Sequence, residues 1–166
     1  MSKLGYRLAL SGTWKAECYG QAGEKKWEDE FTNLITNEGI NHILNTEFHN
    51  GTKVYPWYVG LKHAGSANVA DTLSSHPGWT ECANYSGTRP SFNEAAASGQ
   101  SITNSASKAT FSINTNGQVI AGAFLCSAAS GTSGTLFSVG DFSTGNKTLD
   151  NGDTLQVTYT LNGVSS

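Results

Sequence analysis

Apolar and polar residues alternate through much of this chain, and that alternation predicts β-strands rather than helices. In residues 154–161 every second side chain is apolar: Leu155, Val157, Tyr159 and Leu161. A period of two places these side chains on one face of a strand and the polar ones on the other. The pattern is typical of a half-buried antiparallel strand.

Two hairpins are predicted. Residues 13–35 form the first around a turn at residues 20–23, with Trp14, Ala16 and Cys18 sharing one face of the outgoing strand. The returning strand carries many charges, which is a usual protection of a sheet edge. The Asn-Thr-Asn-Gly sequence of residues 114–117 predicts the second turn, because Asn-Gly tolerates the positive φ angles of a tight turn.

One segment has helical periodicity. Apolar residues recur at helical spacing at Ile40, Ile43, Leu44 and Phe48. Thr36 or Asn37 can cap the start of this helix. We therefore expect a helix at about residues 37–48, lying across an open end or face of the β structure.

The strand-like runs amount to roughly eight strands beside this helix. Residues 119–126 are almost continuously apolar, which indicates a central strand covered on both faces. The expected fold class is mainly β, an antiparallel β-sandwich or jelly roll. We expect one domain across residues 1–166, in which residues 1–10 are either an N-terminal arm or an edge strand.

Composition supports a folded β protein. Charged residues make up only 14% of the chain, and Gly, Ser, Thr and Asn together make up about two-fifths. The seven Phe, six Tyr and four Trp residues argue against disorder. The net charge of -3 disfavours binding to nucleic acid or to an anionic membrane. No apolar run is long enough to span a membrane and no signal-peptide pattern is visible, so we expect a soluble protein in a cytoplasm.

Candidate chemistry is sparse in this sequence. Glu38 and His42 are four residues apart on the expected helix, but a metal site needs a third ligand, so a surface pair is favoured. Glu28 and Glu30 share a strand face, as paired carboxylates of a glycosidase must, but their surroundings indicate an exposed edge. No nucleophile elbow, P-loop or dinucleotide fingerprint is present. We expect no enzyme activity, no metal and no cofactor.

The three cysteines, Cys18, Cys82 and Cys126, are odd in number and widely spaced. They form no CxxC pair, so we interpret them as free and mostly buried thiols.

A long polar crossing at residues 60–88 separates two strand-like runs. It contains Trp79 directly after His-Pro-Gly. Exposed aromatic rings stack on sugars, so Trp79 and Tyr85 suggest carbohydrate binding, whereas a core position is the usual one for tryptophan beside strands. Both interpretations of Trp79 stay open at this point.

Several blocks in order along the chain resemble a family of small virion proteins of tailed bacteriophages of Gram-negative bacteria. The blocks are KWED (26–29), NLI (33–35), WYVGL (57–61), ADT (70–72), SHPGWTE (75–81), YSGTRP (85–90), NSASKATF (104–111), GAFL (122–125), GDTL (152–155) and VTY (157–159). They cover nearly the whole chain, although none is a chemical motif.

The resemblance implies a non-enzymatic structural protein of the phage particle, assembled in the bacterial host cytoplasm. It favours a capsid decoration or cement protein, with the major capsid protein and copies of itself, as a dimer or trimer, as partners. A tail or fibre component that binds a receptor or carbohydrate is the alternative. The resemblance supplies no catalytic residue.

The N-terminal segment offers one physical route to a partner, because an extended strand can add to a partner sheet through main-chain hydrogen bonds. In the other interpretation, Tyr6 to Leu10 forms an ordinary strand of the protein's own sheet. The candidate partner-binding residues are Tyr6, Arg7, Leu8 and Trp79.

Overall fold

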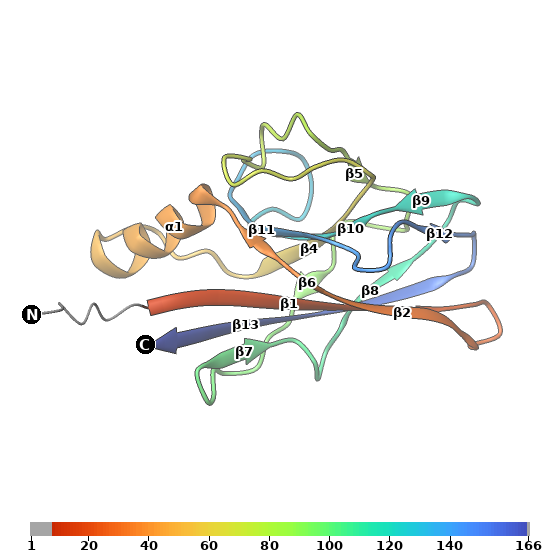
Figure 1. Cartoon of the computed structure of the whole chain (residues 1–166), viewed down its shortest axis with the longest axis horizontal. Coiled ribbons are helices and arrows are strands. Elements are labelled where there is room, and N and C mark those ends of the chain that lie inside the picture. Colours follow the sequence, from red (N-terminus) through yellow and green to blue (C-terminus); the bar gives the residue numbers. More distant parts are fainter. Residues whose placement is uncertain (1–7, 166) are drawn as a thin grey trace, which may run out of the picture.

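The alternating segments pair into two main antiparallel sheets that face each other as a β-sandwich (Figure 1). The computed structural model describes residues 8–165. The first sheet has the order β2-β1-β13-β7, with β8 also paired to β13. Its strands are β1 (Leu8–Tyr19), β2 (Lys25–Thr32), β7 (Ser101–Thr103), β8 (Ala109–Ser112) and β13 (Thr154–Ser165).

The second sheet has the order β3-β11-β10-β4-β5, with β6 also paired to β4. Its strands are β3 (Leu34–Ile35), β4 (Trp57–Lys62), β5 (Glu81–Cys82), β6 (Ser91–Phe92), β10 (Gly122–Cys126) and β11 (Leu136–Asp141). A small sheet joins β9 (Gln118–Ile120) to β12 (Lys147–Leu149), and the described helix is α1 (Asn37–Phe48). Within residues 8–165 no helix is both long and apolar enough to cross a membrane.

The main core lies between the two sheets. The rings of Trp14 on β1 and Tyr159 on β13 are fully buried, and their centroids are 4.2 Å apart. Ala16, Cys18, Leu155 and Val157 extend this layer along the same two strands. Their partners from the second sheet include Val59, Leu61, Ala123 and Leu125. The predicted alternation of β1 and β13 is thus confirmed, because every second side chain points into this core.

The first predicted hairpin is confirmed and the second is wrong. β1 and β2 pair in antiparallel register around residues 20–24, and β2 lies at the edge of the first sheet. Residues 114–117 make a turn in which Gly117 has a φ of 67°, but β8 pairs with β13 while β9 pairs with β12. The turn therefore carries the chain from the first sheet to the small sheet of β9 and β12.

The sequence underestimates the number of strands, because several of the thirteen described ones are only two or three residues long. β3, β5 and β7 contain too few residues to show a period of two. The apolar run at residues 119–126 also divides at Ala121 into β9 and β10. The central position of β10 between β4 and β11 is confirmed, and all five of its residues are buried.

The helix begins as predicted, with Thr36 as its N-cap. The Thr36 hydroxyl accepts a hydrogen bond of 3.0 Å from the amide of Gly39. The side of α1 that faces the sheets carries Gly39 and Ile43. A Cβ atom at Gly39 would lie 2.5 Å from the carbonyl oxygen of Phe137 on β11, so glycine lets the helix approach the strand closely.

The outer face of the second sheet is covered by the part of the crossing that follows β4, residues 63–88, which includes β5. A second apolar cluster forms there from Leu73, Trp79, Phe124, Cys126, Leu136 and Val139. The Trp79 ring lies 5.3 Å from the Phe124 ring, and its indole N–H donates to Asp71 at 2.9 Å. Phe124 fits because its cross-strand neighbour is Gly60, where a Cβ atom would overlap the phenyl ring.

Two buried cations attach the crossing to the strands beneath it. Arg89 is 4% exposed and donates two hydrogen bonds, of 2.7 and 2.6 Å, to the carboxylate of Glu81. It also donates to the carbonyl groups of Ala128 and Gly131, each at 2.8 Å. Lys62, at the end of β4, is fully buried, pairs with Asp141 of β11 and donates to the carbonyl group of Gly65 in the crossing at 2.9 Å. Each buried charge thus has an anionic partner, as the low dielectric of an interior requires.

A substitution at Gly60 tests this packing. We expect Gly60→Ala to destabilise the protein by about 1–3 kcal/mol, because the new methyl group meets the Phe124 ring. Phe124→Leu removes the ring, so the double variant should lose less stability than the sum of the two single variants. Urea unfolding followed by tryptophan fluorescence measures all four proteins. Additive losses would contradict the proposed contact between position 60 and the ring.

Candidate functional site

Trp79 is a buried residue of the second apolar cluster and does not lie on the surface. It is 3% exposed, and its ring stacks on His76 with centroids 4.0 Å apart. Tyr85 is 5% exposed and packs edge-on against Phe111. Neither ring presents an open face, so the structure does not support the interpretation in which these two residues stack on a sugar. Trp79 is also too deeply buried to be a contact residue for a partner in this conformation.

Glu38 and His42 do not act together. The Glu38 carboxylate accepts hydrogen bonds from the backbone amides of Leu73, at 3.2 Å, and Leu136, at 2.6 Å. It therefore joins the helix to the crossing and to β11. His42 instead packs edge-on against Trp57, with ring centroids 5.1 Å apart. Within the described residues no three His, Cys, Asp or Glu side chains converge as metal ligands would.

The carboxylates of β2 alternate between solvent and interior, as a strand requires. Glu28 and Glu30 are exposed on the sheet edge, whereas Asp29 is buried. A hydrogen bond from Lys25 lowers the pKa of Glu28, which is opposite to the raised pKa that a general acid needs. Asp29 accepts hydrogen bonds from the amide and hydroxyl groups of Ser143 and Thr144. Its carboxylate thus ties β2 to the loop after β11.

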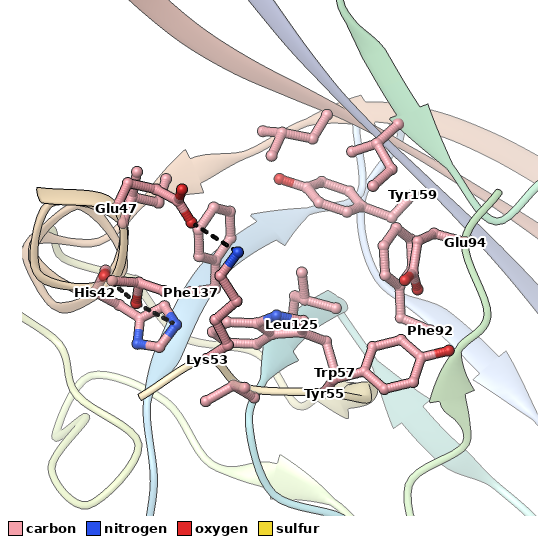
Figure 2. A pocket seen from close by; sticks show the side chains of 15 residues that line it. His42, Glu47, Lys53, Tyr55, Trp57, Phe92, Glu94, Leu125, Phe137 and Tyr159 are labelled. Atoms are coloured by element: carbon pink, nitrogen blue, oxygen red, sulfur yellow. Dashed lines mark hydrogen bonds and ion pairs between the residues drawn. The ribbon is translucent and has the colours of Figure 1, made fainter. Parts of the chain in front are cut away.

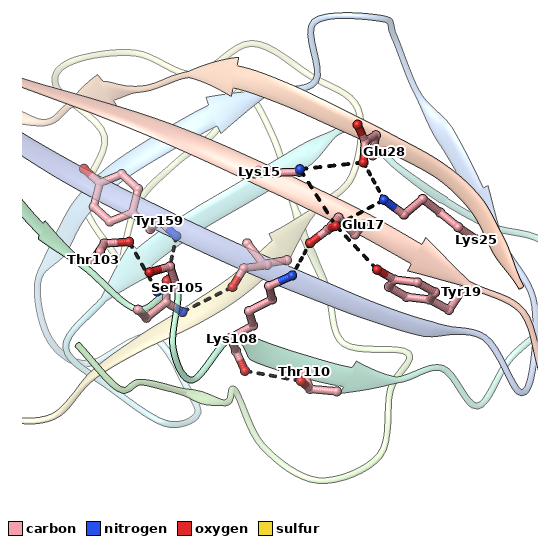
Figure 3. Close-up of polar contacts among 12 residues, drawn as sticks. Lys15, Glu17, Tyr19, Lys25, Glu28, Thr103, Ser105, Lys108, Thr110 and Tyr159 are labelled. Carbon is pink, nitrogen blue, oxygen red and sulfur yellow. Dashed lines mark hydrogen bonds and ion pairs between the residues drawn. The ribbon is translucent and has the colours of Figure 1, made fainter. Parts of the chain in front are cut away.

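Glu17 is the centre of a charge cluster on the outer face of the first sheet (Figure 3). It is 6% exposed, because Lys108, Lys25 and Lys15 surround it. The hydrogen bond from Lys108 lowers the pKa of Glu17 most, and burial opposes that effect. This cluster explains how a residue on the outward face of β1 becomes buried, and its charges are satisfied within the chain.

Exposed apolar side chains gather where the helix lies. Of the described large apolar residues that are exposed, all except Val119 lie on α1, beside it, or at the adjacent ends of β1 and β13. We call this set the helix-end surface; it consists of Leu8, Ile40, Leu44, Phe48, Tyr55, Val69 and Val164. Phe48 is 81% exposed and Leu8 is 78% exposed. Exposed apolar side chains gathered at one end of a molecule are a usual feature of protein interaction sites.

Most of the apolar residues that predicted α1 are exposed in the structure, which the sequence did not indicate. Ile40, Leu44 and Phe48 are four residues apart in turn and are exposed, although Ile40 also lines a groove beside β1 and β3, whereas Ile43 packs against the core. The predicted helix is thus confirmed, and of the four apolar residues at helical spacing only Ile43 packs against the core. Local spacing identifies an apolar stripe but does not show what covers it.

An open strand edge adjoins the helix-end surface. Residues 8–12 of β1 pair with β13 on one side, but the pairing with β2 on the other side begins only at Thr13. Along this edge lies a groove of about 560 Å³, with Leu8, Leu10, Leu34, Ile35 and Ile40 among its lining residues. Among the described residues, no strand pairs with this edge of residues 8–11. Its main-chain N–H and C=O groups can therefore form hydrogen bonds with an added strand, next to the apolar side chains of the groove.

The three N-terminal candidates have different outcomes. Leu8 is described and forms the exposed start of β1, paired with Ser165 of β13. It thus belongs to the protein's own sheet, while its other edge is open. Tyr6 and Arg7 lie outside the described residues, so their predicted role in partner binding stays a prediction.

A pocket lies on the other side of α1, between the helix and the open end of the sandwich (Figure 2). We call it the aromatic pocket. Its cavity volume is about 270 Å³. Its aromatic rings come from His42, Tyr55, Trp57, Phe92, Phe137 and Tyr159, and its charged groups from Glu47, Lys53 and Glu94. These residues come from distant segments of the chain, which is why no local sequence pattern indicated the pocket.

The three thiols are free and buried, as predicted. Burial raises the pKa of Cys18 to about 12, with a further contribution from Asp153. Burial also raises the pKa of Cys82 and Cys126. The nucleophilic thiolate form is therefore scarce at neutral pH in the folded protein.

Removing the Asp29 carboxylate tests its role in acid stability. Burial alone would raise the pKa of Asp29, but the hydrogen bonds from Thr144 and Ser143 outweigh it and lower the pKa. Asp29 therefore stabilises the fold above about pH 4, and this contribution is lost as the pH falls through the folded-state pKa. We expect Asp29→Asn to lose about 2 kcal/mol at pH 7.

The stability difference between Asp29→Asn and the unmodified protein should narrow towards pH 2, as measured by urea unfolding. Glu30→Gln, on the same strand but exposed, is the control and should stay within about 0.5 kcal/mol of the unmodified protein at pH 7. A difference for Asp29→Asn that does not change with pH would show that the carboxylate has no depressed pKa.

Thiol labelling tests the burial of the cysteines. With an aromatic disulfide reagent at pH 7.5, we expect slow reaction of the folded protein and rapid reaction of all three thiols in guanidinium. Rapid labelling of one thiol in the folded protein would mean that its surroundings open readily.

Sequence comparisons add no relative whose site could be superposed on these features, because no protein-family model matches the chain and no characterised protein matches it significantly.

Proposed function

We propose that this chain is a non-enzymatic structural protein of a tailed-phage particle, a decoration or cement protein that binds the outside of the head shell. The single observation that carries the proposal is the helix-end surface, whose exposed apolar residues adjoin an open strand edge. The resemblance of the sequence blocks to phage virion proteins supplies the type of particle. The major capsid protein is the proposed partner.

The helix-end surface offers two kinds of contact to such a partner. A segment of the partner can add a strand to the free edge of residues 8–11, which supplies main-chain hydrogen bonds. The groove beside this edge then receives apolar side chains against Leu10 and Ile40. Burial of an apolar side chain of this size contributes about 1.5–3 kcal/mol, so a few residues suffice for binding.

The same edge is suited to self-association. Two copies placed antiparallel along residues 8–11 would continue the first sheet across a two-fold axis, with identical contacts on both sides. Such a dimer would use the strand edge for self-association and would present the exposed α1 residues Leu44 and Phe48 of both copies to the shell. Its weak individual contacts would then act together through a high effective concentration.

The alternative of a sugar-binding tail or fibre component receives less support. That role was based on Trp79 and Tyr85, and both rings are buried.

Quantifying the protein on purified particles tests the proposal. On particles of the phage that encodes the chain, we expect copies in a fixed ratio to the major capsid protein and density on the head in a cryo-electron map. Heads that lack the protein should lose their DNA at a lower temperature. A handful of copies, or density only on the tail, would contradict a decoration role.

Variants of the helix-end surface test how it binds. The double variant Leu44→Ser/Phe48→Ser should bind at least tenfold more weakly to heads that lack this protein. Each lost apolar contact removes more than about 1.4 kcal/mol of binding free energy. Its melting temperature should be unchanged, since both side chains are exposed. Val119→Ser, on β9 at the far end, is the matched control. Equal binding of the double variant and the control would place the docking surface elsewhere.

A further inference from the structure

The aromatic pocket has an unusual combination of rings and charge. Trp57 is at its centre, with His42 edge-on at 5.1 Å and Phe137 at 5.4 Å between ring centroids. Phe92 and Tyr159, 5.9 Å apart, lie behind these rings and are almost fully buried, so the rings that a ligand can reach are those of Trp57, His42 and Tyr55. Tyr55 lines the pocket and is 79% exposed, so it marks the mouth. A cation placed among such rings is attracted by their negative faces.

The charges that line the pocket are unbalanced. Glu47 of α1 is paired with Lys53 at 3.7 Å, and both side chains are more than half exposed. Glu94, which follows β6, lies on the side of the pocket away from α1 (Figure 2). Its Oε2 atom is buried and has no hydrogen-bond donor among the described residues. Two carboxylates therefore line the pocket beside one ammonium group.

A buried carboxylate oxygen without a donor is costly, because it has lost its water and gained no partner. The fold satisfies its other buried acids: Glu17 accepts from lysines and Asp29 accepts from hydroxyl and amide groups. Glu94 as a residue is only partly buried, but its Oε2 atom is a buried carboxylate oxygen that no described group satisfies. A cation that enters the pocket would supply the missing charge.

We propose that the aromatic pocket binds the side chain of an arginine from a partner protein. A guanidinium group is planar, stacks on aromatic faces and donates two parallel hydrogen bonds to a carboxylate. A lysine ammonium is not planar and interacts with a carboxylate as a point charge. The apolar walls from Ile43, Leu125 and Leu161 suit the aliphatic stem. The choice of a partner protein as the source rests on the proposed function.

The size and position of the pocket agree with this occupant. A volume of about 270 Å³ is at or below the lower limit of sites for drug-sized molecules, roughly 300–1,000 Å³, so it suits one side chain better than a cofactor or a sugar chain. The pocket and the helix-end surface share α1 and Tyr55. An arginine that enters the pocket would therefore belong to a partner already docked on the helix end.

Peptide binding measured by NMR tests the proposal. The probe is a blocked pentapeptide, acetyl-Gly-Gly-Arg-Gly-Gly-amide, and the readout is the indole N–H signal of Trp57, assigned with Trp57→Phe. We expect saturable shifts of this signal with the arginine peptide, weaker shifts with lysine and none with citrulline, which has the same shape without the charge. Free arginine amide tests whether a main chain on both sides is tolerated.

Three variants separate binding from folding. Glu94→Gln keeps the shape but removes the charge, so the arginine peptide should bind roughly 10- to 100-fold more weakly. Its melting temperature should be unchanged or higher, because the variant loses a partly buried carboxylate whose Oε2 atom has no donor among the described residues. Tyr55→Ala should weaken binding because an aromatic ring at the mouth is lost. The stability of the fold should not change, because Tyr55 is largely exposed. Glu30→Gln, on the far sheet edge, should bind as the unmodified protein does.

The possible results separate this inference from the proposed function. Binding of arginine and citrulline peptides with equal affinity, or no effect of Glu94→Gln, would overturn the site. If free arginine amide binds but the arginine peptide does not, the ligand is not a side chain of a partner protein. If the peptide binds through Glu94 but the chain is absent from phage heads, the proposed function fails while the arginine site stands.

Discussion

The fold depends on one requirement: β10 is apolar on both faces, so the second sheet must be covered on both sides. The first sheet covers the inner side through Ala123 and Leu125, which leaves Phe124 and Cys126 facing outward. The crossing meets this need by placing Trp79 against Phe124. The crossing is long because it must cover the outer face of the second sheet. It is polar because a segment with little regular structure must satisfy its backbone hydrogen-bonding groups through turns and side chains. The buried Arg89 fixes the cover to the loop after β10.

This arrangement decides what the helix can do. Since the crossing already covers the outer face of the second sheet, α1 has only the open end of the sandwich to close. It does so by close approach through Gly39 and by packing of Ile43, not by burying its apolar stripe. Ile40, Leu44 and Phe48 are left facing solvent, and the concave side of the helix encloses the aromatic pocket with strands from both sheets. One helix thus serves two different surfaces.

Features with a local cause were predictable from the sequence, and features set by distant contacts were not. Alternation located β1 and β13, the hydroxyl of Thr36 located the helix start, and the apolar run located β10. The turn at residues 114–117 was recognised, but the partner of β8 was not, because pairing depends on which strands are free. Leu8 was found as a candidate contact residue from its place in the chain. Arg89 and Glu94 gave no signal, since burial of a charge depends on residues far away in sequence.

Both ends of the described chain lie at the helix end, because β1 enters and β13 leaves the first sheet side by side there (Figure 1). A tag or a second protein fused before Leu8 or after Ser165 would therefore crowd the apolar surface and the open strand edge. The turn between β1 and β2, at residues 20–24, lies at the opposite end of the same sheet. Gly23 there has a positive φ of 86° and no atom near a Cβ position, so the backbone is already shaped as a tight exposed turn. Foreign peptides inserted at this turn would project away from the helix end, which makes it a suitable position for carrying an added sequence without crowding the apolar surface.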